Sequence, residues 1–126
     1  MTQSDRRPSV WVGHIILRVR DVAASKAFLT KLGMRDVVPE ASVGILELRG
    51  GTHLVILPTD QPVANDTPAG FDLMVDDIEA AHVRYLEAGI DPSPMVSGKI
   101  HTSFEIREPG GHVITVNSTH VSDQPV

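Results

Sequence analysis

The sequence predicts an α+β fold in which one βαβββ module occurs twice. Two internal matches carry this prediction. Residues 13–21 resemble residues 69–77 at a shift of 56 positions, and residues 50–57 resemble residues 110–116, with His53 over His112 at a shift of 59 positions. Self-similarity that holds over most of a chain indicates duplication, and small differences in spacing belong in loops.

Each module is expected to open with a strand, a capped helix and a glycine. An aspartate just before a helix accepts hydrogen bonds from the free amides of the first turn, and a glycine adopts the left-handed conformation that ends the last turn. Apolar residues recur at helical spacing between these two signals. The matching features are strands at 11–19 and 71–75, Asp21 and Asp77, helices at 22–31 and 78–87, and Gly33 and Gly89.

Three short strands are expected after each helix, with a glycine-rich turn before the last of them. They are placed near 37–38, 44–48 and 52–57 in the first module, and near 93–96, 101–107 and 112–117 in the second. A proline-rich stretch between the modules indicates a linker. The expected organisation is one domain at 10–117 (module one 10–57, linker 58–69, module two 70–117) with tails at 1–9 and 118–126.

The composition argues against several classes of protein. At 126 residues the chain has the length of one domain, and without cysteine it has neither disulfides nor thiolate metal sites. A net charge of −5 and the lack of a Lys/Arg cluster argue against a nucleic-acid partner. No apolar run is long enough to cross a membrane, and residues 1–9 lack the apolar stretch of a signal peptide, so we expect a cytoplasmic protein.

Two segments carry a family resemblance. The order His14-Ile15-Ile16-Leu17-Arg18-Val19, Asp21, Ser25, Phe28 and Leu32-Gly33 resembles the opening of a vicinal oxygen chelate (VOC) module, and residues 107–116 resemble the common D-P-D-G-N-x-I-E-L ending of that family. The superfamily includes glyoxalases, bleomycin-resistance proteins and dioxygenases. The resemblance implies a cupped, mostly antiparallel sheet with the helices on the outside and a small molecule in the cup.

The resemblance also implies where a metal ion would be bound, namely on the first and fourth strands of each module. Carried over to this chain, those positions are His14, Ile56, Gly70 and Thr115, with Val55 as the neighbouring choice for Ile56. A catalytic metal site needs about three histidine or carboxylate ligands. Only His14 supplies such a ligand, so we expect the usual metal centre to be degenerate. Binding of a divalent metal ion at a shifted site is the alternative.

Further polar side chains are expected in the cup, because side chains alternate between the two faces of a strand. The residues sharing the face of His14, their counterparts in module two and the polar row of the strand at 101–107 are the candidates. The candidate ligand-binding residues are His14, Ile16, Arg18, Ile56, Asp72, Met74, His101, Ser103, Glu105 and Thr115. Of these, His101 and Glu105 are candidate catalytic residues, suited to act as an acid–base pair.

Several candidates also have a purely structural interpretation. His14 is either a ligand or a buried histidine bonded to a carbonyl group. Asp72 either faces a ligand or forms an ion pair with Arg18. His101 and Glu105 line either the pocket or the solvated side of an edge strand.

The other polar residues are expected to be structural or exposed. His53 and His112, which the shift of 59 aligns, flank turns and are expected in solvent. His82 is expected in solvent on its helix, and Ser25 is interpreted as a helix-face residue without an apparent base.

Three functions are consistent with the sequence. The first is a small-molecule-binding protein similar to bleomycin-resistance proteins, with a negative charge that suits a cationic ligand. The second is a metal-dependent glyoxalase-type lyase or isomerase, or a dioxygenase, that uses His14 with Asp72, His101 or Glu105 and the metal as a Lewis acid. The third is a metal-free enzyme with His101 and Glu105 as acid and base. The resemblance further implies a homodimer.

Overall fold

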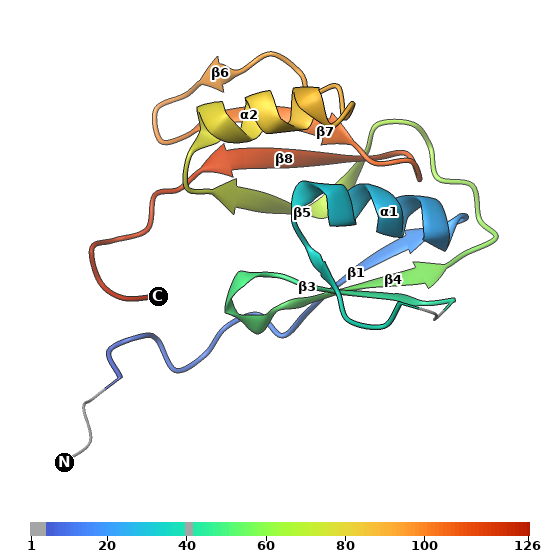
Figure 1. Ribbon diagram of the computed structural model, residues 1–126, viewed down its shortest axis with the longest axis horizontal. Helices are drawn as coiled ribbons and strands as arrows, with labels where there is room; N and C mark the ends of the chain where they lie inside the picture. The colour runs from blue at the N-terminus through green and yellow to red at the C-terminus, as the bar shows by residue number, and fades with distance from the viewer. Residues whose placement is uncertain (1–4, 40–41) are drawn as a thin grey trace.

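The computed structural model describes residues 5–39 and 42–126 and contains two βαβββ modules (Figure 1). The first consists of β1 (His14–Val19), α1 (Val22–Leu32), β2 (Arg35–Asp36), β3 (Gly44–Glu47), a short 3₁₀ turn (Arg49–Gly51) and β4 (His53–Pro58). The second consists of β5 (Thr67–Val75), α2 (Ile78–Glu87), β6 (Val96–Ser97), β7 (Thr102–Arg107) and β8 (His112–Ser118). The predicted α+β fold and its duplicated unit are confirmed.

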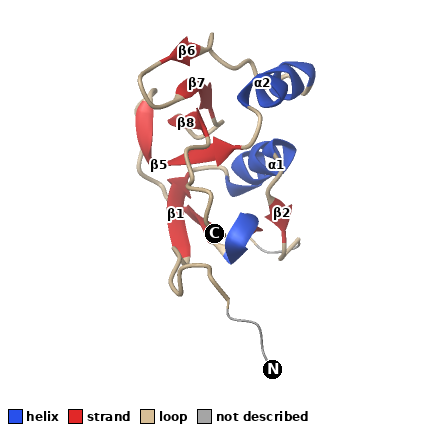
Figure 2. Cartoon of the chain, turned by 90° about the vertical axis from the view of Figure 1, so that its left-hand side faces the viewer, coloured by secondary structure: helices blue, strands red, loops and turns tan. Residues whose placement is uncertain are grey.

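Each module forms its own four-stranded sheet. The strand orders are β1-β4-β3-β2 and β5-β8-β7-β6, so the two sheets have the same topology. In each, the first and last strands of the module pair in parallel, whereas the other neighbours pair antiparallel. Both helices lie on one side of the sheets, and the opposite face is left uncovered (Figure 2).

The predicted helix signals are confirmed. Asp21 accepts a hydrogen bond from the amide of Ala24 at 3.1 Å, and Asp77 accepts one from the amide of Ala80 at 3.0 Å. Gly33 has φ +117°, the left-handed conformation that ends α1 without the steric cost of a Cβ atom. Within the described part of the chain, no helix is long and apolar enough to cross a membrane.

Several strand boundaries differ from the prediction. β2 lies at Arg35–Asp36 instead of 37–38, and β6 lies at Val96–Ser97 instead of 93–96. β1 begins at His14 instead of residue 11, and β5 begins at Thr67, inside the expected linker 58–69. Pro68 is tolerated in β5 because this strand lies at the edge of its sheet, where one side of the backbone needs no hydrogen-bond partner. The register of β5 against β8 then shifts between Pro68 and Asp72.

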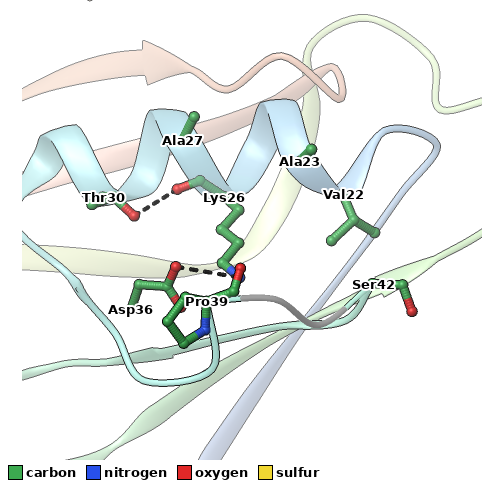
Figure 3. A pocket seen from close by; sticks show the side chains of 8 residues that line it. All are labelled: Val22, Ala23, Lys26, Ala27, Thr30, Asp36, Pro39 and Ser42. Carbon is green, nitrogen blue, oxygen red and sulfur yellow. Dashed lines mark hydrogen bonds and ion pairs between the residues drawn. The ribbon is translucent and has the colours of Figure 1, made fainter.

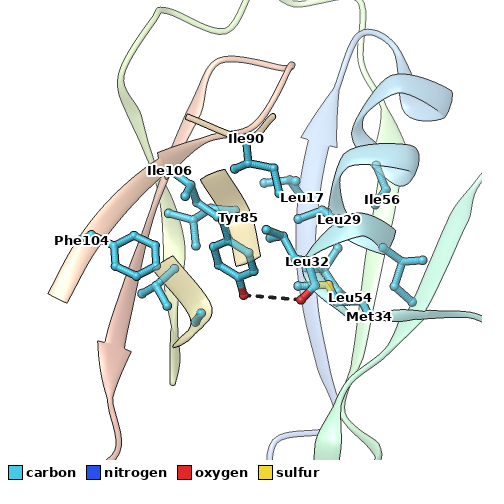
Figure 4. Close-up of a cluster of buried hydrophobic side chains, with 14 of the residues drawn as sticks. Leu17, Leu29, Leu32, Met34, Leu54, Ile56, Tyr85, Ile90, Phe104 and Ile106 are labelled. Carbon is cyan, nitrogen blue, oxygen red and sulfur yellow. Dashed lines mark hydrogen bonds between the residues drawn. The ribbon is translucent and has the colours of Figure 1, made fainter. Parts of the chain in front are cut away.

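The buried side chains of both modules form one hydrophobic core (Figure 4). Tyr85 of α2 crosses between the modules, and its hydroxyl donates a hydrogen bond to the carbonyl of Leu32 at the end of α1 (3.4 Å). The side chain of Phe104 packs edge-on against Tyr85. Complete burial of each large apolar side chain stabilises the fold by about 1.5–3 kcal/mol, so the modules stabilise one another.

A buried carboxylate forms a second connection between the modules. Glu108, in the turn between β7 and β8, accepts hydrogen bonds from the hydroxyl of Ser25 on α1 (2.5 Å) and from the amide of Gly110 (2.8 Å). Its other oxygen lies 2.6 Å from Nδ1 of His112 and accepts the His112 amide at 3.2 Å. Burial alone raises the pKa of Glu108, but these hydrogen bonds outweigh it and hold the pKa below its usual value.

The Glu108 network makes the fold sensitive to acid. Because the pKa of Glu108 is lower in the folded protein than in the unfolded chain, its contribution to stability is complete above the ordinary carboxyl pKa and is lost as the pH falls through the lowered one. Glu108→Gln is expected to lower the free energy of unfolding at neutral pH by about 1–3 kcal/mol and to weaken its acid dependence. Urea unfolding across the acidic range measures both effects. Glu87→Gln, at an exposed position, is the control and should change neither the free energy of unfolding nor its pH dependence. If Glu108→Gln lost stability at acidic pH as steeply as the wild type, this account would be contradicted.

A close approach at Gly110 yields a second stability prediction. A Cβ atom there would lie 2.5 Å from Oε1 of Glu108 and 2.7 Å from Cγ1 of Val19. Gly110→Ala is therefore expected to destabilise the fold by about 1–3 kcal/mol through overpacking. Gly13→Ala is the matched control, because nothing lies within 4 Å of its Cβ position. Equal midpoints of urea unfolding for the two variants would show that the turn relaxes freely.

Candidate functional site

The uncovered face of the first sheet begins with β1. His14, Ile16 and Arg18 are exposed, whereas Leu17 and Val19 are buried in the core. This alternation is the strand periodicity expected from the sequence. His14, Ile16 and Arg18 therefore lie together on the face that the helices leave uncovered, as the sequence predicts.

The prediction for Ile56 is wrong. Ile56 is fully buried among the core side chains, on the opposite face of the sheet from His14. β4 pairs with β1 so that His53 lies opposite His14 and Val55 lies opposite Ile16. The shift of 59 caused the error: the buried residues of the two last strands correspond at a shift of 60, and one residue of slip moves every side chain to the other face. Val55 is the residue on this strand that shares the face of Ile16 and His14.

The second sheet places the other candidates in two rows. Asp72 on β5 lies opposite Thr115 on β8, which lies opposite Glu105 on β7. One step along, Met74 and Ser103 flank Asn117. These residues share one face of the module-two sheet.

Asp72 has a different partner from the one considered above. Its Oδ2 accepts a hydrogen bond from Nδ2 of Asn117 at 2.7 Å, whereas residues 5–39 and 42–126 contain no ion pair between Asp72 and Arg18. Asn117 is buried on β8, two residues beyond Thr115 and on the same face, as strand alternation predicts. The carboxylate is thereby held in place at the edge strand.

His101 is not joined to Glu105. It lies just before β7, where its Nδ1 is 2.8 Å from the carbonyl of Ser118, and its ring packs edge-on against His120. Glu105 is exposed, and its amide donates a hydrogen bond to the hydroxyl oxygen of Ser93. The structure therefore shows no contact between the two proposed acid–base groups within its described residues.

The structure brings together a polar row that sequence reasoning missed. His14, His53, Glu47 and Arg35 lie opposite one another on β1, β4, β3 and β2. Nε2 of His53 is 3.0 Å from Oε2 of Glu47, and Arg35 Nη1 is 3.5 Å from Oε1 of the same carboxylate. The signal was available: Glu47 and His53 are equidistant from Gly50 in the hairpin turn and therefore pair across it.

The other polar residues are also more buried than expected. His112, expected in solvent, is buried against Glu108. His82 is partly buried, with Nε2 2.8 Å from the carbonyl of Ser93 and its ring edge-on to Phe104. Ser25 is fully buried and donates to Glu108, so its role is structural.

A family model described as "Glyoxalase/Bleomycin resistance protein/Dioxygenase superfamily" matches residues 11–116. The chain belongs to this superfamily. No curated protein matches the chain.

Solved structures share the fold of this chain. Lactoylglutathione lyase from Agrobacterium tumefaciens is 17% identical with a TM-score of 0.70, and the match covers 89% of this chain and 96% of that one. A superfamily member from Sphaerobacter thermophilus is 16% identical (TM-score 0.69; 87% and 98% covered). The oxidase ChaP-H2 is 20% identical (TM-score 0.69; 91% and 98% covered). Identities this low establish the fold alone.

The residues at the VOC metal positions do not fit a metal ion. With the register corrected, those positions hold His14, Val55, Gly70 and Thr115, which together provide one imidazole and one neutral hydroxyl. Gly70 also has φ +87° and offers no side chain. Among residues 5–39 and 42–126, no three His, Asp or Glu side chains are grouped so as to hold a metal ion.

A hollow of about 500 Å³ lies away from this face, between α1 and the segment that follows β2 (Figure 3). Lys26, the one cation among its described lining residues, is engaged: Nζ donates to the carbonyls of Val38 and Pro39 and pairs with Asp36. The other lining residues are Val22, Ala23, Ala27, Thr30 and Ser42. Lys26 therefore anchors the described part of this segment, and its charge is paired with that of Asp36.

Proposed function

We propose that this VOC protein binds a small molecule on the uncovered face of its sheets and that its usual metal centre is degenerate, as in a bleomycin-resistance type of binding protein. The observation that carries the proposal is the donor set at the four metal positions, where His14 alone retains a metal-ligating side chain. A scaffold without chelating groups still offers a shaped surface for binding.

The composition of the face supports binding. Ile16 and Met74 are 46% and 47% exposed on the two edge strands β1 and β5 and provide apolar surface for a ligand. Polar groups flank them: Arg18 on β1, and Asp72 and Thr115 in module two. Apolar surface with a few placed polar groups is the usual composition of a small-molecule site.

The alternative, a metal-dependent glyoxalase-type lyase or a dioxygenase, has less support. It requires His14 to act with Asp72, His101 or Glu105. Asp72 is bonded to Asn117 and His101 to Ser118, on a different sheet from His14. A carboxylate and an imidazole can both bind a metal ion. In this structure, however, both side chains form hydrogen bonds within module two instead.

Elemental analysis tests the proposal. Untagged protein purified without chelator is expected to contain far less than one transition-metal ion per chain, and chelator should leave its melting temperature unchanged. A thermal-shift screen of small molecules, with and without divalent ions, should give the same stabilising compounds in both arms. About one metal ion per chain, lost in His14→Ala but retained in His120→Ala, would support the metal enzyme instead.

We further expect a cytoplasmic homodimer. Val10, Trp11 and Val12 are 79%, 67% and 58% exposed just before β1, and such apolar surface is commonly covered in an assembly. Light scattering coupled to size-exclusion chromatography should give twice the chain mass. Trp11→Ser with Ile16→Ser should shift the protein toward the monomer, and a monomeric mass for the wild type at high concentration would refute the dimer.

A further inference from the structure

Two hydroxyl side chains of this chain follow an arginine by three positions, and their surroundings in the structure differ. Ser9 follows Arg6 and Arg7, and Thr52 follows Arg49. Protein kinases that prefer basic substrates bind such arginines through carboxylates of their own, in charge-assisted hydrogen bonds. Because the kinase must also bring its catalytic aspartate to the hydroxyl, the target has to lie on an accessible segment of chain.

Thr52 is held inside the folded hairpin. Its hydroxyl donates a hydrogen bond to the carbonyl of Val12 at 2.6 Å, and its own carbonyl accepts one from the amide of Leu48 at 2.8 Å. The arginine before it, Arg49, pairs with Asp76 of module two. A kinase would have to unfold the turn between β3 and β4 to reach Thr52, so the fold protects this hydroxyl.

Ser9 lies on an open segment. Residues 5–13 are all exposed and belong to no helix or strand, and they lead away from both sheets (Figure 1). Pro8 fixes its own φ and disfavours the helical conformation of Arg7, so the segment is kept extended. A kinase cleft can therefore take up Ser9 and its neighbours while the two modules stay folded.

The two arginines before Ser9 form exposed contacts. Arg6 donates a hydrogen bond to the side-chain oxygen of Gln124 at 2.7 Å. Arg7 pairs with Asp5 at 2.7 Å, and the side chains of this pair are 62% and 61% exposed. Exposed ion pairs contribute little to stability, so the carboxylates of a kinase can replace these partners without unfolding the chain.

We propose that Ser9 is a phosphorylation site for a serine kinase that selects its substrates by arginines before the target. The Oγ–H bond of Ser9 breaks as Oγ forms a bond to the γ-phosphorus of ATP. The bond from that phosphorus to the bridging oxygen breaks, and ADP leaves with the electron pair. The proton of the hydroxyl passes to the catalytic aspartate of the kinase.

The phosphate has a physical consequence for the proposed homodimer. Ser9 directly precedes the exposed apolar run Val10, Trp11 and Val12. A phosphate adds a charge of about −1.5 to −2 at neutral pH. Beside an apolar interface this charge opposes association, because it must lose water when the partner covers it. This step rests on the proposed homodimer, whereas the modification itself does not.

Phosphorylation of the folded, full-length protein tests the site. The probe is the catalytic subunit of cyclic-AMP-dependent protein kinase with ATP and Mg²⁺, and we expect one phosphate per chain by intact-mass spectrometry. Fragmentation should place the phosphate on Ser9, and Ser9→Ala should take up none. Arg6→Gln combined with Arg7→Gln should lower kcat/KM by about tenfold, because charge-assisted hydrogen bonds to the kinase are lost.

Two variants are matched controls for this experiment. Ser122→Ala removes another exposed serine, from a segment without arginine, and should retain the full phosphate. Arg49→Gln should retain it as well, because the fold protects Thr52. Phosphate on Thr52, uptake by Ser9→Ala or an unchanged kcat/KM in the arginine variant would overturn the proposed site.

A lysate of the cells that make the protein tests whether they contain such a kinase. With labelled ATP, the wild type is expected to gain more label than Ser9→Ala. Equal labelling of the two proteins would overturn the proposal for those cells.

Light scattering then tests the effect on assembly. At a concentration at which the untreated protein is dimeric, the phosphorylated protein should have a lower mass, and phosphatase should restore the dimer. A phosphorylated protein that stays dimeric overturns the effect on assembly and leaves the site standing. An untreated protein that is already monomeric overturns the homodimer, and mass spectrometry still decides the site.

Discussion

A carboxylate buried between the modules is the constraint on which their arrangement depends. A charge out of water costs several kcal/mol unless polar partners surround it, so Glu108 must keep its donors in reach. Those donors come from α1, from the turn itself and from the start of β8. Ser25 belongs to module one and the others to module two, so satisfying one carboxylate holds α1 against the second sheet. The Glu108 network and the hydrogen bond of Tyr85 therefore join the two modules.

That arrangement decides which faces are free to bind. Both helices pack on one side of the sheets (Figure 2). In strands such as β1 and β7, alternate residues are buried in the core and the residues between them face away from it. The composition of the candidate site thus follows from the alternation of side chains between the two faces of each strand. His14, Ile16 and Arg18 are together because Leu17 and Val19 are needed in the core.

Local signals predicted most of the fold but only part of the site. The N-caps at Asp21 and Asp77 bond to amides three residues further along the chain, and such short-range contacts can be predicted from the sequence. The hydrogen bond between Ser25 and Glu108 joins residues 83 positions apart, and no local sequence pattern predicts it. The pairing of Glu47 with His53 was predictable from the hairpin, but it is visible only when residues are considered across the turn and not one at a time.

A single residue in a turn separates the two carboxylate-bound histidines. In module one, Thr52 stands between the paired glycines and His53, whereas in module two His112 follows Gly111 directly. The core residues of the strands still correspond, Leu54 with Ile114 and Ile56 with Val116, so the extra residue must place the first histidine on the opposite face. His112 consequently serves the core, and His53 is available to a ligand. The same extra residue explains why Val55, and not Ile56, lies at the fourth-strand metal position of module one. Thr52 thus accounts both for the wrong prediction at Ile56 and for the exposure of the His53 side chain.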